Sequence, residues 1–493
     1  MLFNSYVFVL GFLPLALTGF FAACRFGRNV AGCWLVAASL VFYAWWNPAN
    51  LPVLLASVAG NFAVARLIGA TAGRPRLQGA VLTGGIAANL AALAFYKYLA
   101  GLFAWFGLAF AAPALPLGIS FFTFTQIGYL IDCRQGLARD RSTLDYALFV
   151  TFFPHLIAGP ILHNREVMPQ FADPATYRFD ARNLAVGVSI FLIGLLKKCL
   201  FADQIGAVVA PGFAQAGTLA MGGAWLAALS YSLQLYFDFS GYSDMAIGLA
   251  RMLNVRFPLN FNSPYKAQSV IEYWQRWHMS LTRWLTLFLY NPLALAIARR
   301  RPALDRRTLI GFASLVALPT IVTMGLAGVW HGCGLQFLIF GLLHGSYLTI
   351  NQACRTWRRR PPADTRVAVA RRVLLTYLAV LVGAVFFRAA SVGQALAMLE
   401  GMAGLHGVAF AWPDLPAVRH IVWMVALYAV VWGAPNTQQI MRAHGPALGK
   451  VLPWPLPRLA WQPTLRWAVA FGCATTLGLL SIGGTGEFLY FQF

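Results

Sequence analysis

The sequence predicts an all-α membrane protein that crosses the bilayer many times, and three observations support this. Hydrophobic residues make up 59% of the 493 residues and charged residues only 11%, whereas about 25% of residues are charged in a typical soluble domain. Apolar runs close to the length that crosses about 30 Å of hydrocarbon recur along the chain. The basic residues gather in the short links between these runs.

The apolar runs are the first elements that the sequence predicts, because each is long enough, or nearly so, to span the membrane as a helix. The first run exceeds the usual length of a signal-peptide core and lacks a preceding basic region, so we expect it to be retained as a helix. The runs include Tyr6–Cys24, Val30–Trp46, Gln78–Tyr96, Asn183–Leu196, Thr308–Trp330, Val373–Phe387 and Trp467–Ile482.

The formal net charge of +22 would suggest a nucleic-acid partner in a soluble protein. Here the positive-inside rule accounts for the charge, because cytoplasmic links are rich in Lys and Arg. We therefore expect the lipid bilayer, and no nucleic acid, as a partner, and we place the N-terminus outside. The links assigned to the cytoplasmic face are Arg25–Arg28, Arg74–Arg76, Arg134–Arg141, Arg299–Arg307 and Arg355–Arg372.

One segment between two of these cytoplasmic links should not cross the membrane. Three apolar segments, Gln78–Tyr96, Tyr98–Ala112 and Pro116–Ile131, separate Arg74–Arg76 from Arg134–Arg141, and an even number of crossings is required. Tyr98–Ala112 is short, and Pro116–Ile131 opens with Pro-Leu-Gly. Either could be re-entrant, which is tolerated only inside protein or along a wet cavity.

Two further segments depart from plain spanning helices. Phe152–Met168 reads FFPHLIAGPILHNREVM, and its proline and glycine residues interrupt a helix. The second is an amphipathic helix expected over Ile271–Phe288, with Arg276 and Arg283 on one face; such a helix lies in the membrane interface or enters it from the cytoplasm. Its aromatic and apolar face has three-to-four spacing, in Trp274, Trp277, Leu281, Trp284 and Phe288.

Histidines at membrane depth are the main candidates for chemistry. Ionisable groups are costly and rare there, so each is a functional hypothesis by default, although a lone histidine can simply bond a neighbouring carbonyl. His278 lies on the amphipathic helix, and His331 and His344 lie in or beside apolar helices. Neutral imidazole can remove a hydroxyl proton near pH 7, because its unperturbed pKa is about 6.5. The sequence has neither a GxSxG motif nor a phosphate-binding Gly-rich loop.

Asp238 and Asp244 are also expected near membrane depth, on either side of Gly241. They could bind a cation, or one of them could orient a histidine. Six residues on a helix separate them by about 120°, so they do not share one face, and we expect each to cap or bond backbone near Gly241. The seven cysteines include no CxxC pair, so neither a metal site nor a disulfide framework is expected.

Recognisable motifs occur along nearly the whole chain. They are FYAWW at Phe42–Trp46, LGISFFTFTQIGYLID at Leu117–Asp132, FFPHLIAGPI at Phe152–Ile161, LQLYFDFSGYSDMAIG at Leu233–Gly248, NFNSPY at Asn260–Tyr265, WQRWHMSLTRWL at Trp274–Leu285, VWHG at Val329–Gly332, FFRA at Phe386–Ala389 and the terminal FLYFQF. These motifs resemble those of the membrane-bound O-acyltransferase family. The resemblance is strongest to the bacterial branch that includes the alginate O-acetyltransferase membrane subunit.

The resemblance implies a fold in which a ring of tilted helices surrounds a thinned centre, where a cytoplasmic funnel meets an outer opening. One domain is expected over residues 1–493, with N-terminal helices in 1–115, a catalytic core in about 116–350 and C-terminal helices in 351–493. The amphipathic helix would then line the pore. A multi-pass protein of the bacterial inner membrane is expected.

The resemblance also assigns roles to residues. The histidine of the WHG motif, His331, is expected to be catalytic, and so is His278, which matches a functional histidine of the teichoic-acid D-alanylation relatives. His344 has no assigned role. The residues expected to bind the substrates are Trp274, Arg276, Trp277, Trp330, Asp238 and Tyr242.

The reaction implied is transfer of an acetyl group, taken from cytoplasmic acetyl-CoA, toward hydroxyls of an exported polysaccharide such as alginate. We expect His331 to act as general base on the hydroxyl, while His278 positions the thioester or stabilises its oxyanion. Arg276 and Arg283 could meet CoA phosphates, although the topology explains their charge equally well. No permanently bound cofactor is expected, but a periplasmic or membrane-anchored acetyltransferase partner is.

Other functions stay open at this stage. The acceptor could instead be cellulose, peptidoglycan or another exopolysaccharide, or, in a family member of another kind, a lipid or a protein, because acceptor identity rests on analogy. A transporter for a polysaccharide precursor is an alternative from another class. It would need a wide polar path, and the charges expected within the membrane are few for that purpose.

Overall fold

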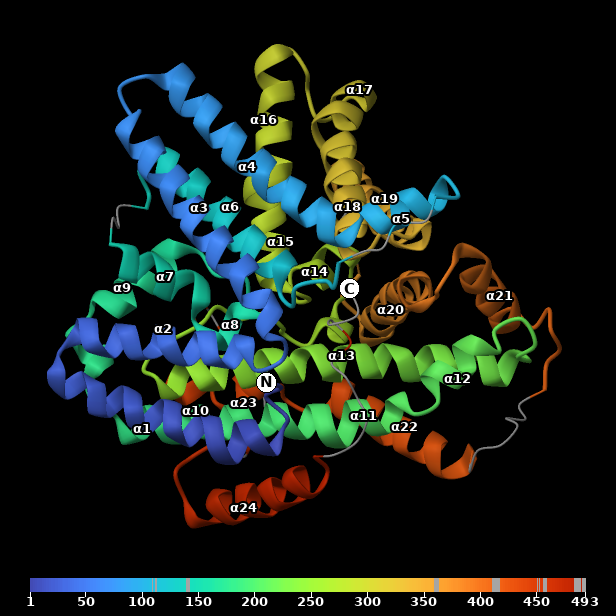
Figure 1. The fold of residues 1–493 in the computed structure, drawn as a ribbon. Helices are drawn as coiled ribbons and strands as arrows, with labels where there is room; N and C mark the ends of the chain where they lie inside the picture. The colour runs from blue at the N-terminus through green and yellow to red at the C-terminus, as the bar shows by residue number, and fades with distance from the viewer. Residues whose placement is uncertain are drawn as a thin grey trace. The chain divides into compact units, whose positions relative to one another are not determined.

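The computed structural model describes residues 1–108, 110, 113–138, 142–358, 363–409, 417–449, 451, 453–454, 459–482 and 489. Parts of the segment Tyr98–Ala112, of the basic links Arg134–Arg141 and Arg355–Arg372, and most of the terminal FLYFQF motif lie outside these residues. The described chain is helical, with one isolated parallel bridge between Pro258 and Leu448. The predicted all-α class is therefore confirmed (Figure 1).

The chain forms two compact units. Unit 1 comprises Met1–Leu200, Phe239–Leu259 and Pro435–Gln492, and unit 2 comprises Phe201–Asp238 and Asn260–Ala434. The prediction of a single domain stays a prediction, and each unit is described by itself.

Unit 1 is built around two groups of helices. In one, α3, α4 and α6 pack against one another; in the other, α1 packs on α2, and α10 on α24. Its elements are η1 (Val7–Phe12), α1 (Leu13–Ala23), η2 (Cys24–Phe26), α2 (Arg28–Ala44), η3 (Pro48–Asn50), α3 (Leu51–Ala70), α4 (Pro75–Lys97), α5 (Leu99–Trp105), α6 (Ile119–Arg134), α7 (Thr143–Thr151), α8 (Phe153–Leu156), α9 (Asn164–Ala172), η4 (Pro174–Tyr177), α10 (Ala181–Leu196), α23 (Thr437–Ile440), η9 (Arg442–His444) and α24 (Leu465–Leu480).

Unit 2 holds the predicted histidines. The chain enters it through η5 (Lys197–Ala202), and the first part of the long helix α13 (Met221–Met252) belongs to it. Its other elements are α11 (Asp203–Gly206), α12 (Val209–Ala214), η6 (Pro264–Lys266), α14 (Val270–Trp274), α15 (Met279–Leu285), η7 (Thr286–Tyr290), α16 (Asn291–Arg300), α17 (Leu309–Phe312), η8 (Ala313–Ala317), α18 (Leu318–His331), α19 (Leu335–Trp357), α20 (Arg366–Arg388), α21 (Val392–Met402) and α22 (Ala417–Gly433).

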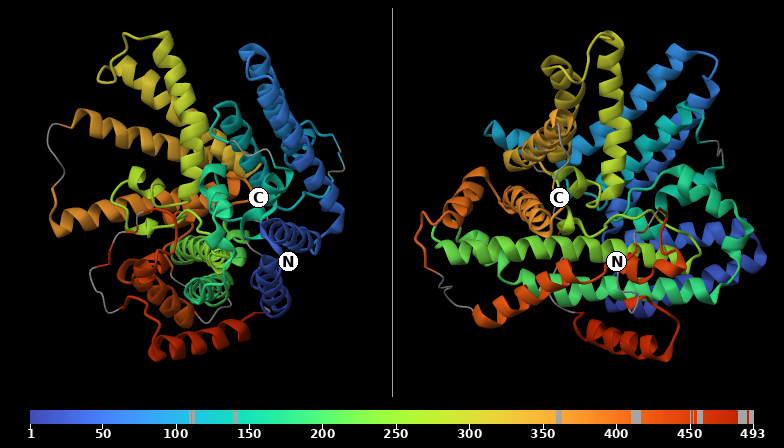
Figure 2. Two further views of the ribbon diagram at one scale, coloured as in Figure 1. Left: turned by 90° about the vertical axis from the view of Figure 1, so that its left-hand side faces the viewer. Right: turned by 180° about the vertical axis from the view of Figure 1, so that it is seen from behind.

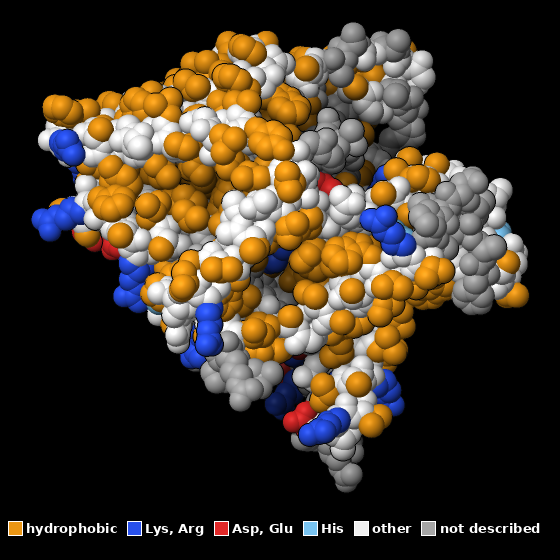
Figure 3. Space-filling model, turned by 90° about the horizontal axis from the view of Figure 1, so that it is seen from below, with side chains coloured by type: hydrophobic (Ala, Val, Ile, Leu, Met, Phe, Trp, Pro, Cys, Tyr) orange, Lys and Arg blue, Asp and Glu red, His pale blue; other side chains and the backbone are white. Residues whose placement is uncertain are grey.

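Among the described residues, seven helical segments are long and apolar enough to cross a membrane. Two of them, Pro48–Ala70 and Met279–Arg300, are not among the runs predicted from the sequence. The first contains Asn61 and Arg66, which interrupt its apolar pattern. Hydrophobic side chains are spread over the face drawn in Figure 3 and far outnumber the Lys and Arg side chains visible there. Both observations agree with a multi-pass membrane protein.

The non-spanning segments follow the predictions with one correction. Among the described residues of Tyr98–Ala112 the helix is α5, whose seven residues are too few to cross the hydrocarbon. Phe152–Met168 is broken as expected, between α8 and α9. The single amphipathic helix expected over Ile271–Phe288 is wrong, because the chain forms two short helices, α14 and α15, that are separated at His278.

Glycines bring α18 and α19 of unit 2 into close contact (Figure 1 and Figure 2). A Cβ added at Gly341 would lie 2.2 Å from the carbonyl oxygen of Met324 and 3.0 Å from the Cα of Gly328. A Cβ at Gly328 would meet the carbonyl oxygen of Phe337 at 2.2 Å. Because no larger side chain fits there, this pair of glycines sets the distance between the two helices.

Candidate functional site

His331 is the last residue of α18 and is 4% exposed. Aromatic rings surround its imidazole: the ring centroids of Trp330, Phe387 and Phe340 lie 4.8, 4.9 and 6.0 Å from that of His331. Phe387 comes from α20 and Phe340 from α19, so three helices of unit 2 hold this histidine. The site is therefore rigid and largely apolar, which strengthens electrostatic interactions within it.

His278 occupies the break between α14 and α15. Its backbone is left-handed, with φ 41° and ψ 53°, a conformation that is uncommon for a residue with a Cβ. The side chain is buried, and its Nδ1 lies 3.1 Å from Oδ1 of Asn260. His278 precedes the Met279–Arg300 span, and burial lowers the pKa of its imidazole to about 3. The ring is therefore neutral near pH 7.

The same Asn260 oxygen accepts two further hydrogen bonds, from the backbone N–H of Ser280 at 3.3 Å and from Oγ of Ser280 at 2.8 Å. The carbonyl oxygen of Asn260 accepts a hydrogen bond from the N–H of Met279 at 2.9 Å. The segment that begins at Asn260 thus holds the turn at His278 through both side-chain and backbone contacts.

His344, which has no predicted role, lies on α19 and is 1% exposed. Nε1 of Trp274 donates a hydrogen bond to its Nδ1 at 3.2 Å. The ring of Phe340 packs on His344 at 4.7 Å and also on His331. The structure therefore joins the predicted Trp274 to His331 through His344 and Phe340.

The other predicted substrate residues have different surroundings. Trp277 is buried, with its ring 5.0 Å from that of Phe261. Arg276 forms an ion pair with Glu272 at 2.6 Å and donates to the carbonyl oxygen of Asn262 at 3.3 Å. This ion pair already balances the charge that was expected to meet phosphate.

Asp238 and Tyr242 both lie on α13, and both are buried. Asp238 belongs to unit 2, whereas Tyr242 belongs to unit 1 and stacks on Phe3, with ring centroids 4.7 Å apart. Their predicted contacts with substrate stay predictions.

Asp244 requires a correction, because side chains rather than backbone satisfy its carboxylate. Within unit 1 it accepts hydrogen bonds from Nζ of Lys197 at 2.6 Å, Oγ1 of Thr437 at 2.6 Å and Nε2 of Gln438 at 3.1 Å. Since these partners come from η5 and α23, sequence spacing could not indicate them. Because three donors satisfy the Asp244 carboxylate, its ion pair with Lys197 fits a structural role.

A cavity of about 850 Å³ opens in unit 2 beside α14 and α19. Arg355, Arg358 and Arg372 line it, together with Tyr347 and the native cysteine Cys354. The sequence identified these arginines only as a cytoplasmic link and missed their shared cavity. An apolar run predicts a helix, but it does not show that the end of α19 and the start of α20 line the same cavity.

Gln268 connects this cavity to the histidine elements. Nε and Nη2 of Arg372 donate to Oε1 of Gln268 at 3.1 and 2.7 Å. Gln268 directly precedes α14, whose last residue is Trp274. The cavity wall and the series of contacts from Trp274 through His344 and Phe340 to His331 therefore share α14 and α19.

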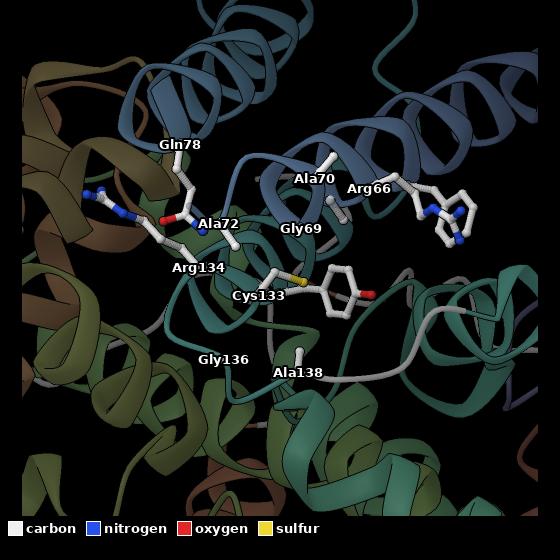
Figure 4. Close-up of a pocket in the computed structure, with 12 residues that line it drawn as sticks. Arg66, Gly69, Ala70, Ala72, Gln78, Cys133, Arg134, Gly136 and Ala138 are labelled. Carbon is white, nitrogen blue, oxygen red and sulfur yellow. The ribbon is translucent and has the colours of Figure 1, made fainter. Parts of the chain in front are cut away.

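Unit 1 contains a second cavity, of about 740 Å³, between α3, α4 and α6 (Figure 4). Among the described residues that line it, Arg66 and Arg134 are charged, and Figure 4 shows their side chains pointing in different directions. They do not converge on one anion, and none of the predicted catalytic residues lines this cavity.

Comparison with known proteins adds independent findings. The model of the membrane-bound O-acyltransferase family matches residues 117–391. The peptidoglycan O-acetyltransferase of Helicobacter pylori is 39% identical, over 83% of this chain and 81% of its own. The probable alginate O-acetylase AlgI of Azotobacter vinelandii is 34% identical over the whole of both chains. The teichoic acid D-alanyltransferase of Streptococcus thermophilus is 30% identical, over 50% of this chain and 58% of its own.

Proposed function

The chain belongs to the membrane-bound O-acyltransferase family and is an O-acyltransferase; from this premise we propose that it transfers acetyl groups from cytoplasmic acetyl-CoA toward hydroxyls of an exported polysaccharide. The observation that carries the proposal is the buried His331, which closes α18 and contacts Phe340 of α19. The other end of α19 lines the arginine-rich cavity. The inner membrane of a bacterium is the proposed location.

The cavity of unit 2 is the proposed donor site. CoA carries phosphates, and arginine binds phosphate through its planar fork of N–H donors. Arg355 and Arg358 supply that fork at the cavity, while Arg372 also holds Gln268. The positive-inside rule places this link in the cytoplasm, where acetyl-CoA is made available.

The proposed chemistry centres on His331. Its imidazole removes the proton of the acceptor hydroxyl while the hydroxyl oxygen attacks the thioester carbonyl carbon. The C–S bond then breaks, and the CoA thiolate takes the proton back from His331. The apolar shell of Trp330, Phe340 and Phe387 excludes water, which limits hydrolysis of the thioester.

The acceptor class is proposed from the relatives. Their names assign O-acetylation to peptidoglycan in one case and to alginate in others, and both polymers present sugar hydroxyls outside the cytoplasm. We propose an exported polysaccharide of this class, reached either directly or through a periplasmic or membrane-anchored acetyltransferase partner. A transporter would leave the thioester intact, so turnover of acetyl-CoA separates the two functions.

The test measures ester-linked acetate on the polysaccharide of cells that express the chain, together with CoA release by their membranes from radiolabelled acetyl-CoA. His331→Ala should reduce both to background, while the amount of protein in the membrane is unchanged. His406→Ala is the matched control, because His406 sits in the turn after α21 beside Glu400 and should retain activity. Full acetylation by His331→Ala would refute the role of His331. Parallel strains that make alginate or acetylated peptidoglycan identify the acceptor.

A further inference from the structure

We propose that Asn260 is a positioning residue that fixes the tautomer of His278 and thereby makes Nε2 of this histidine a hydrogen-bond acceptor at the reacting centre. The inference rests on the proposed function, because the reacting centre is the one that acetyl transfer requires. It concerns a residue to which neither the motif resemblance nor the relatives assign a role.

The first step is the identity of the Asn260 atom. The backbone N–H of Ser280 can only donate a hydrogen bond, and it points to the atom assigned as Oδ1 at 3.3 Å. An amide nitrogen in this place would bring two donors together, so the oxygen assignment is chemically required. Oγ of Ser280, at 2.8 Å, then donates to the same oxygen.

The second step is the proton on His278. An amide oxygen accepts and never donates, so the 3.1 Å contact requires a proton on Nδ1 of His278. A neutral imidazole carries one N–H, and its other nitrogen, Nε2, then has a lone pair. Burial keeps the ring neutral.

The third step concerns the role of His278. Stabilising an oxyanion requires a donor, and the neutral tautomer held by Asn260 offers none at Nε2. Of the two expected roles, the geometry therefore supports positioning through an accepted hydrogen bond.

The surroundings of Asn260 suit this task. The side chain is fully buried, at 0% exposure, so water cannot replace it as the acceptor. Backbone hydrogen bonds from Met279 to Asn260 and from Asn262 to Arg276, each 2.9 Å, hold the Asn260–Asn262 segment against the Arg276–Met279 segment. They support the left-handed backbone of His278, whose strain must be offset by neighbouring contacts.

The test begins with Asn260→Leu, which fills similar volume but removes the acceptor. We expect kcat/KM for acetyl transfer at pH 8 to fall by about tenfold to 100-fold, the range seen when a group that orients a metal-binding histidine is lost. Ser280→Ala is the matched control, because it removes one donor to the same oxygen and leaves His278 bonded; it should stay within about threefold of wild type. Asn260→Asp retains an acceptor oxygen and should recover most of the lost activity.

A double-mutant cycle separates positioning from general damage. If Asn260 acts through His278, then Asn260→Leu should have no further effect on kcat/KM in a His278→Ala background. The inference would be overturned if the two substitutions reduced kcat/KM by independent factors that multiply, or if the Asn260→Leu enzyme were active. If Asn260→Leu does not insert into the membrane, low activity of either Asn260→Asp or Ser280→Ala would still overturn the inference. An inactive wild-type enzyme would instead contradict the proposed function.

Discussion

At the scale of single residues, two buried histidines of unit 2 carry their protons on opposite nitrogens. Nδ1 of His278 donates to Asn260, whereas Nδ1 of His344 accepts from the indole N–H of Trp274, which has no acceptor atom. Neutral His344 therefore carries its proton on Nε2. Its contacts with Trp274 and Phe340 fit a structural link between α14 and α19.

Lys266 is a second residue whose surroundings change its chemistry. Its Nζ donates to the carbonyl oxygen of Ala434 at 2.7 Å. Burial, and then the charge of Arg276, lower the pKa of its ammonium group from 10.5 to about 8. About half of the amine is therefore neutral near pH 8, whereas an ordinary lysine is almost fully charged there. Because only the neutral amine is nucleophilic, Lys266 should react early with a small acylating reagent.

We expect acetic anhydride to modify Lys266 with a rate that rises through pH 8 and then levels off, as measured by mass spectrometry of the proteolysed protein. The Lys266→Arg variant identifies the modified peptide. A rate that keeps climbing toward pH 10 would show an ordinary lysine.

The sequence could predict which residue types matter in the site, but not their partners. His331 and His278 stand out because imidazole is rare at membrane depth, and the motifs around them are specific. Asn260 lies 18 positions from His278, and Trp274 lies 70 positions from His344. Neither separation corresponds to a helix or strand repeat, so only the folded chain shows these pairs.

At the scale of helices, the contact between α18 and α19 determines where His331 lies. Gly341→Ala would place a methyl group 2.2 Å from the Met324 carbonyl oxygen, so the helices must separate. We expect a loss of about 1–3 kcal/mol of stability, typical of overpacking, and a clear loss of acetyl transfer. Thermal unfolding in detergent and the transfer assay measure the two effects.

Gly84→Ala on α4 is the matched control. No atom lies within 4 Å of a Cβ built there, and alanine favours a helix by up to about 1 kcal/mol. This variant should therefore be as stable as wild type or more so. If Gly341→Ala unfolds at the same temperature as the wild type, the two helices can move apart without loss of stability, which contradicts the prediction.

Apolar runs predicted five of the seven described segments that can cross a membrane, and the failure at Ile271–Phe288 has a physical cause. Three-to-four spacing continues through Ile271–Phe288, so the sequence favours one helix there. The chain breaks at His278 because contacts from the Asn260–Asn262 segment hold that residue in a left-handed conformation. Tertiary contacts thus override the local preference.

At the scale of the whole molecule, the positive-inside rule assigns the Arg355–Arg372 link to the cytoplasm. Cys354, at the end of α19, is exposed and lines the proposed donor cavity. A membrane-impermeant maleimide should therefore label it in inverted vesicles and not in intact cells, and added CoA should slow the labelling.

The Cys354→Ser variant provides the control, because the loss of one label from the protein identifies this site among the exposed cysteines. Labelling of Cys354 in intact cells would reverse the assigned orientation. Labelling in inverted vesicles that is insensitive to CoA would argue against the donor cavity while leaving the orientation in place.

The composition was sufficient to predict the class of the whole molecule, because few charges and repeated apolar runs leave no soluble alternative. The division into two units could not be predicted. Unit 1 gathers segments from both ends and the middle of the chain, including Phe239–Leu259 and Pro435–Gln492, and no local pattern marks such long-range association.

The wide π-helical turn η8, Ala313–Ala317, lies in the same continuous helical segment as His331. A π turn contains one residue more than a turn of the α-helix that it interrupts. It therefore changes the direction in which the side chains on one side of it point around the helix axis. Deleting one residue here would rotate the preceding segment by about 100° relative to His331. The spacing between Thr308 and His331 should therefore tolerate point substitutions far better than insertions or deletions.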